Sequence, residues 1–232
     1  MFSTSLFGQS HLVDNERVGV RSIRFFYYSS VSSDTIGEGD PFADFKFIND
    51  NEIDARALTP NALSEVISYD GAVPVELFRE EMTESGVERI PLAELKFPRE
   101  WKGVLFFVIR DSSNPHFGFK FFPIEYWGPS IPDHNIRVMN LCGKSMGFQI
   151  GKEKAKVPSL QFEDVPMSSG EQPMPFRIAM FDEDLGGRML LSSMIPPFRS
   201  SRVLMITYPT GRSGTGVRTL NVTDLPGLST ER

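Results

Sequence analysis

The sequence contains the same pattern of residues twice, about a hundred positions apart. Residues 73–78 (VPVELF) and 174–179 (MPFRIA) share the order apolar, proline, apolar, charged, apolar. Two further pairs of segments follow the same order along the chain, 45–49 with 136–140 and 104–108 with 203–207. The offsets between partners are 101, 91 and 99 residues. A period of this size matches one β-sandwich domain, so the sequence predicts two related β modules in tandem.

Short segments rich in Phe, Val, Ile and Tyr, bounded by Gly, Pro, Asn, Asp or Ser, predict strands throughout the chain. We expect strands near residues 20–29, 43–49, 53–58, 64–69, 73–80, 87–95, 102–110, 117–125, 135–142, 147–151, 157–163, 174–181, 188–195, 201–208 and 216–223. The best candidate for a helical turn is 61–67, which follows Thr59 and Pro60. The predicted fold is all-β, with two tandem antiparallel immunoglobulin-like sandwiches related by internal duplication.

The boundary between the modules is expected in the segment 127–134, where two prolines and a glycine disfavour both a helix and a central strand. We divide the chain into a leader or flexible arm at 1–17, a first module at 18–129, a second module at 130–226 and a tail at 227–232. The leader is polar and lacks periodicity, which is typical of a chain terminus without regular structure.

Composition excludes several classes of function. The chain of 232 residues is 40% hydrophobic and 12% aromatic, which favours a folded protein. A formal charge of -6 argues against nucleic acid as a partner. The longest apolar run, 104–109, is far shorter than the roughly 20 residues that cross a bilayer, so we expect no transmembrane segment. The first residues as written do not form a secretory signal, although such a segment can be removed.

The cysteine and the histidines do not match a metal or cofactor site. A blue-copper site needs two histidines, a cysteine and usually a methionine, with a histidine soon after the cysteine. His11, His116 and His134 all precede Cys142, the only cysteine. We therefore predict no copper site, and we interpret Cys142, at the end of an apolar strand, as a small core residue.

Two acidic clusters and one glycine-rich segment are interpreted as turns. Residues 49–54 are dense in side-chain oxygens but lack the glycine and the distal glutamate of a calcium-binding loop, and 182–184 precedes a hairpin tip. Residues 210–216 lack the Gly-Lys-Ser/Thr ending of a phosphate-binding loop and lie between two expected strands. We expect no metal and no cofactor.

No pattern of residues indicates a catalytic site, so we do not expect an enzyme. A Gly-x-Ser-x-Gly nucleophile motif is absent from the sequence. Asp133 and His134, in the expected linker, are the local candidates for a hydrolase that uses carboxylates in the cleft between the modules. Paired carboxylates depend on a separation in space that sequence does not give, so a hydrolase stays open as an alternative.

The chain is enriched in aromatic residues, and these are its best candidates for a binding function. Fifteen of the twenty Phe residues precede residue 130, and consecutive rings, as in 25–28 and 106–107, point to opposite faces of a strand. Some rings therefore leave their own core to cover the partner module, form an oligomer interface or stack on a sugar. We expect Trp101, Tyr126 and Trp127 to be the most exposed rings and the candidate ligand-binding residues. Alternation in 117–121 places three Phe rings on one sheet face, in a core or an interface.

An Asn-terminated strand, a later Pro-containing strand and a strongly apolar strand recur once per module. This order resembles uncharacterised bacterial cell-envelope proteins built from tandem immunoglobulin-like or transthyretin-like sandwiches, over about residues 20–224. The single cysteine means that the inter-sheet disulfide of antibody domains is absent. The resemblance rests on pattern and transfers no functional residues.

The resemblance implies a non-catalytic structural or interaction protein, associated with the cell envelope or extracellular. Its implied location is the periplasm, the cell envelope or the medium, and its implied partner is another protein or an envelope component. A carbohydrate-binding protein that uses exposed aromatics, a hydrolase and a cytoplasmic location remain the alternatives. The oligomeric state is not predicted.

Overall fold

The computed structural model describes residues 21–29, 45–49, 52–56, 58–70, 73–110, 119–167, 172–182, 186–210 and 216–228. Four four-stranded sheets account for the strands of these residues. The predicted leader, His11, His116 and most of the glycine-rich segment 210–216 lie outside the described ranges.

The first half of the chain forms sheets A and B. Sheet A has the order β4 (Ile67–Tyr69), β1 (Arg21–Tyr28), β7 (Gly103–Arg110) and β8 (Phe119–Glu125). Sheet B has the order β3 (Glu52–Arg56), β2 (Phe45–Asn49), β5 (Val75–Thr83) and β6 (Gly86–Leu95). The two sheets enclose one apolar core, so this half is a β-sandwich.

The second half repeats this arrangement after a 3-10 turn, η2 (Gly128–Ser130). Sheet C has the order β12 (Phe162–Pro166), β9 (Asn135–Asn140), β15 (Arg202–Thr210) and β16 (Gly216–Val222). Sheet D has the order β11 (Glu153–Val157), β10 (Met146–Ile150), β13 (Met174–Asp182) and β14 (Gly186–Ile195). The predicted all-β fold with two sandwich units is confirmed. The strand order of the two units is the same, and their origin by duplication stays a prediction.

One pair of strands in each unit departs from the expected antiparallel pattern. β1 pairs with β7 in parallel, with Ile23 opposite Val104, and β9 pairs with β15 in parallel, with Ile136 opposite Val203. Both pairs lie in the middle of their sheets, A and C. Sheets A and C therefore contain both parallel and antiparallel pairs. In each of them the central pair consists of the first strand of the unit and a strand near its end.

The strand order also corrects one of the three repeated pairs. Residues 45–49 form β2, whose counterpart in the second unit is β10 rather than the segment 136–140. That segment belongs to β9, the counterpart of β1. The two segments resemble each other because both are short apolar strands that end in asparagine, and such a pattern does not specify a place in a sheet.

Two local expectations are also corrected. The single strand expected at 157–163 is the end of β11 and the start of β12, two separate strands. The segment 61–67 does not form a helical turn. Asn61 adopts a left-handed φ of 58°, and Leu63 instead makes an isolated bridge to Phe26 of β1 before β4 begins.

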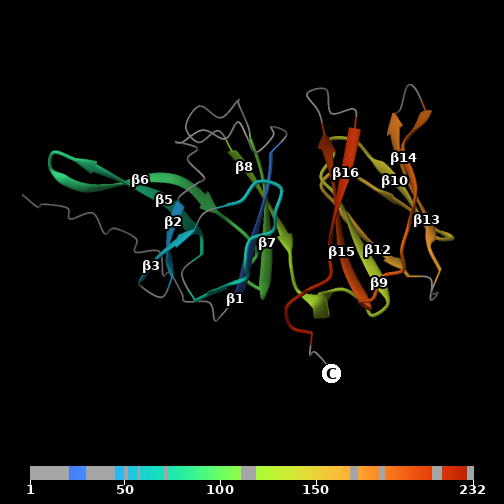
Figure 1. Cartoon of the computed structure of the whole chain (residues 1–232), viewed down its shortest axis with the longest axis horizontal. Helices are drawn as coiled ribbons and strands as arrows, with labels where there is room; N and C mark the ends of the chain where they lie inside the picture. Colours follow the sequence, from blue (N-terminus) through green and yellow to red (C-terminus); the bar gives the residue numbers. More distant parts are fainter. Residues whose placement is uncertain are drawn as a thin grey trace, which may run out of the picture.

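The four sheets stack in the order B, A, C, D, as Figure 1 shows from left to right. One apolar core lies between B and A and another between C and D. A third core joins the units, and its buried members come from sheets A and C and the segments beside them. Sheets A and C are thus covered on both faces, whereas B and D each keep one outer face.

The third core, which lies between the two units, is called the seam below, and aromatic side chains fill much of it. Phe25 and Phe106 stack at 5.4 Å in the first core, while the next residues along each strand, Phe26 and Phe107, stack at 5.3 Å in the seam. Tyr208 of the second unit lies 4.9 Å from the Phe107 ring. The expectation that consecutive rings face opposite sides, and that some cover the partner module, is confirmed for these residues.

The structure describes two of the three Phe rings expected on one sheet face at 117–121. Phe119 is buried in the first core and Phe121 packs against that core, which confirms a core role for these two rings. Residue 117 lies outside the described ranges. The described chain contains no helix that is long and apolar enough to cross a membrane.

Because Phe107 is buried at the centre of the seam, we expect Phe107→Ala to lower the free energy of unfolding by about 3–5 kcal/mol. Met82→Ala, at an exposed position on β5, is the matched control and is expected to change it by less than about 0.5 kcal/mol. Urea denaturation followed by circular dichroism measures both. Equal, small effects of the two variants would show that the seam does not contribute to folding stability.

Candidate functional site

The three rings expected to be exposed do not form a common binding surface. Tyr126 is buried in the seam with an exposed fraction of 0%, so its predicted exposure is wrong. Trp101 is half-buried and packs against the first core, on the other side of sheet A. Trp127 is half-buried beneath Gly227, where an added Cβ would lie 2.4 Å from the indole ring.

The burial of Tyr126 follows from its contacts with the end of the chain. Its hydroxyl donates to the backbone oxygen of Asp224 over 2.6 Å and accepts a hydrogen bond of 2.8 Å from Arg24. Arg24 also forms an ion pair of 2.6 Å with the Asp224 carboxylate. Burial raises the pKa of Tyr126, so the hydroxyl stays protonated at neutral pH. Tyr126 therefore holds the C-terminal segment against β1 and β8.

Asp133 and His134 are neighbours on the surface. His134 Nε2 lies 3.7 Å from Asp133 Oδ2, and the side chains are 76% and 56% exposed. A hydrogen bond from Ser201 lowers the pKa of Asp133, with smaller contributions from His134 and Arg202, so this carboxylate is not poised to donate a proton near neutral pH. The hydrolase alternative gains no support from this pair.

The seam itself is a packed core where the hydrolase alternative required a cleft. Two carboxylates do lie at its edge, Glu125 at the end of β8 and Asp164 on β12, and both bind the guanidinium of Arg137. The distances are 3.0 Å to Glu125 and 2.8 Å to Asp164. These carboxylates join the two units through a shared cation, which is a structural role.

Cys142 is buried, which agrees with its predicted role as a core residue. Burial raises the pKa of its thiol to about 12, so the thiol is protonated at neutral pH and its reactive thiolate form is disfavoured. Within the described ranges, His, Cys, Asp and Glu side chains form no group of three or more that could hold a metal ion.

The buried thiol leads to a test by chemical labelling. We expect a thiol reagent such as DTNB to leave the folded protein unmodified at pH 8 and to label one cysteine per chain in denaturant. The folded protein holds the thiol proton more tightly than the unfolded chain, so this group contributes stability below the unfolded thiol's pKa of about 8.5. That contribution is lost as the pH rises toward about 12. Rapid labelling of the folded protein would contradict the burial.

The outer face of sheet D carries a feature that the sequence analysis did not identify. Side chains alternate along each strand, so the residues between the core positions of β10, β11 and β13 point outward. One row across the sheet places Lys154 opposite Gln149 and Gln149 opposite Arg177. The next row consists of Lys156, Gly147, Ala179 and Met189. These two rows, together with Phe181, are called the cationic face below.

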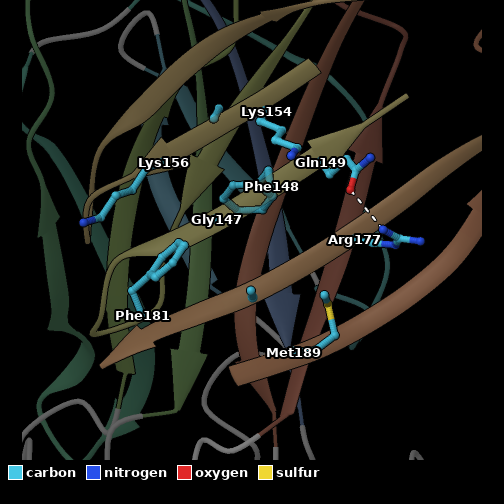
Figure 2. A pocket seen from close by; sticks show the side chains of 10 residues that line it. Gly147, Phe148, Gln149, Lys154, Lys156, Arg177, Phe181 and Met189 are labelled. Atoms are coloured by element: carbon cyan, nitrogen blue, oxygen red, sulfur yellow. Dashed lines mark hydrogen bonds between the residues drawn. The ribbon is translucent and has the colours of Figure 1, made fainter. Parts of the chain in front are cut away.

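Small residues leave a hollow in the middle of the cationic face. Gly147 and Ala179 form its floor, next to the bulge at which the register of β13 and β14 shifts after Ile178. The Phe181 ring bends over the floor, and an added Cβ at Gly147 would lie 2.5 Å from this ring. The hollow is shallow and measures about 420 Å³. Figure 2 shows Lys154 and Lys156 at the top of the view, Arg177 at the right, Phe181 at lower left and Met189 at lower right.

The cations of the cationic face have no acidic partner within the described ranges. No ion pair among the described residues joins Lys154, Lys156 or Arg177 to a carboxylate, and the lining of the hollow contains neither Asp nor Glu. Arg177 donates a hydrogen bond of 3.3 Å to Gln149, drawn as a dashed line in Figure 2. The Lys156 ammonium lies 5.2 Å from the centre of the Phe181 ring. A guanidinium and two ammonium groups beside exposed apolar side chains can bind a surface that presents carboxylates.

The exposed apolar side chains on this face are large. Phe181 is 41% exposed, and Met189 is 54% exposed. Phe, Met and Arg are enriched in protein interfaces. A sequence signal for this face exists in the segment 152–156 (KEKAK), because lysines at every second position of a strand point to one side.

No model of a known protein family matches the sequence. No curated protein matches it significantly either.

Proposed function

We propose that this protein is a non-catalytic interaction protein that binds an acidic protein partner through the cationic face of sheet D. The supporting observation is the combination of Lys154, Lys156 and Arg177, which have no acidic partner among the described residues, with the exposed ring of Phe181 and the exposed thioether of Met189. The protein has a net charge of -6, so a sheet face that gathers cations without acidic partners in the described part of the chain is opposite in charge to the molecule as a whole. Such a patch attracts carboxylates, and its apolar side chains add contact area.

The same proposal places the protein in the cell envelope or outside the cell. Support for this location comes from the tandem-sandwich pattern of the sequence, which resembles cell-envelope proteins. Fractionation of the cells that produce the protein, followed by immunoblotting, tests it. Recovery in the periplasmic, membrane or medium fraction is expected, and recovery in the cytosol alone would contradict the location while leaving the binding face to be tested separately.

Binding at the cationic face can be tested by site-specific photocrosslinking. A photoreactive amino acid replaces Met189 on the face, and the control replaces Val66, which is 47% exposed in the first unit. After illumination of the producing cells, we expect a defined protein adduct at position 189 and none at position 66. High ionic strength in a lysate is expected to reduce the adduct, because exposed charges are screened.

Charge reversal distinguishes specific binding at this face from nonspecific adhesion of the protein surface. Arg177→Glu together with Lys154→Glu is expected to abolish the adduct at position 189. Lys120→Glu, an exposed lysine on β8, is the matched control and is expected to leave the adduct unchanged. An adduct that survives reversal of the face, or equal adducts at positions 189 and 66, would refute the proposed function.

A further inference from the structure

The outer face of sheet B has a hollow at the place that corresponds to the cationic hollow of sheet D. It measures about 460 Å³ and lies beside β5 and β6, whose register shifts after Leu77, as that of β13 and β14 shifts after Ile178. Its apolar lining includes Ile48, Phe78 and Pro91. Each outer face therefore has a hollow beside a bulge in the corresponding pair of strands.

The charge at the corresponding position is inverted. Glu76 directly precedes the bulge residue Leu77, and Arg177 directly precedes the bulge residue Ile178. Glu76 is exposed on the outer face and lies opposite Glu94, so two carboxylates are neighbours across β5 and β6. Like charges directly opposite each other on adjacent strands are unfavourable. This face therefore gains from a cation supplied from outside.

The other charges on the outer face of sheet B are largely paired among themselves. Glu80 lies between two cations, 2.6 Å from Lys46 and 3.7 Å from Arg89. Glu94 has a partner in Lys96 at 3.2 Å, but both side chains are more than half exposed, and such surface pairs are weak. Glu76 has no ion pair among the described residues. The carboxylates that remain for a partner are thus Glu76 and Glu94, beside the hollow.

Exposed apolar side chains also lie on both outer faces. On sheet B they include Ile48 and Ile53, opposite each other on β2 and β3, and Val87 and Met82, opposite each other on β6 and β5. On sheet D they are Phe181 and Met189 of the cationic face, with Met194 nearby on β14. Each face therefore offers apolar surface next to charges whose sign is complementary on the other face.

We propose that the acidic partner of the cationic face is the outer face of sheet B of a second copy of this protein, so that Arg177 of one copy meets Glu76 and Glu94 of the next. This inference rests on the proposed function of the cationic face. The two faces lie at opposite ends of the four-layer stack (Figure 1) and cannot meet within one molecule. A contact between different surfaces of identical chains does not close on itself unless its rotation closes a ring, so the copies add head to tail into chains.

Sedimentation velocity of the purified full-length chain tests the self-association. We expect the average mass to rise with concentration at low ionic strength, without stopping at the dimer, and to fall toward the monomer at high ionic strength. A monomer at every concentration, or an association that stops at the dimer, would overturn the inference.

Charge reversals in the same assay test the specific contact. Arg177→Glu and Glu76→Arg each place like charges in the contact, so each variant alone is expected to associate at least about tenfold more weakly. In an equimolar mixture the two variants can alternate, so that residue 177 of each copy meets a residue 76 of opposite charge in the next copy, and the mixture is expected to form chains again. Lys120→Glu is the control and is expected to associate like the wild-type chain. Failure of the mixture to assemble, with both variants folded by circular dichroism, would refute the pairing of these two faces.

The crosslinking experiment distinguishes this inference from the proposed function. An adduct at position 189 with twice the mass of the chain, linked to peptides of β5 or β6, supports a second copy as the partner. An adduct with a different protein, from a chain that stays monomeric in sedimentation, overturns the inference and leaves the proposed function standing. Absence of any adduct, with a monomeric chain, overturns both.

Discussion

The packing of sheet A against sheet C determines which surfaces remain free for function. β7 and β15 are buried along both of their faces, because Phe106 and Met205 point into the sandwich cores while Phe107 and Ile206 point into the seam. An inner sheet with two apolar faces is stable only between two covering layers. The outer faces of sheets B and D are therefore the broad sheet surfaces that stay exposed.

Much of the fold follows from local sequence patterns. Segments rich in β-branched and aromatic residues, separated by turn residues, predicted most of the described strands. The exception is β11, which the strand expected at 157–163 overlaps only at Val157. The pairing of β1 with β7 and of β9 with β15 was not predictable, because it joins segments far apart in the sequence and depends on which sheet each strand enters. The match of 45–49 with 136–140 failed for the same reason: apolar alternation shows which side of a strand is buried, not the place of that strand in a sheet.

The candidate site was harder to predict than the fold. Tyr126 and Trp127 stand beside charged and linker residues, a pattern typical of exposed rings, yet residues 224–228 return across them from the other end of the chain. The lysines at every second position near Lys154 do predict one positively charged side of a strand. Their combination with Arg177 and Phe181 depends on the register of β10 with β13, and the role of Gly147 depends on the ring that bends over it. Such combinations become visible only when the strands are placed side by side.

The parallel pairing inside sheets A and C also affects the order in which the chain can fold during its synthesis. β1 is synthesised before the other strands of its unit, but its neighbour β7 is synthesised only near the end of that unit. In the same way β9 has no central partner until β15 has been synthesised. Contacts of such long sequence separation slow folding. Once the first unit has closed, its seam surface around Phe26 and Phe107 remains open to water until β15 arrives with Tyr208. A first unit that closes before β15 is made would expose an aromatic surface of the kind that promotes aggregation.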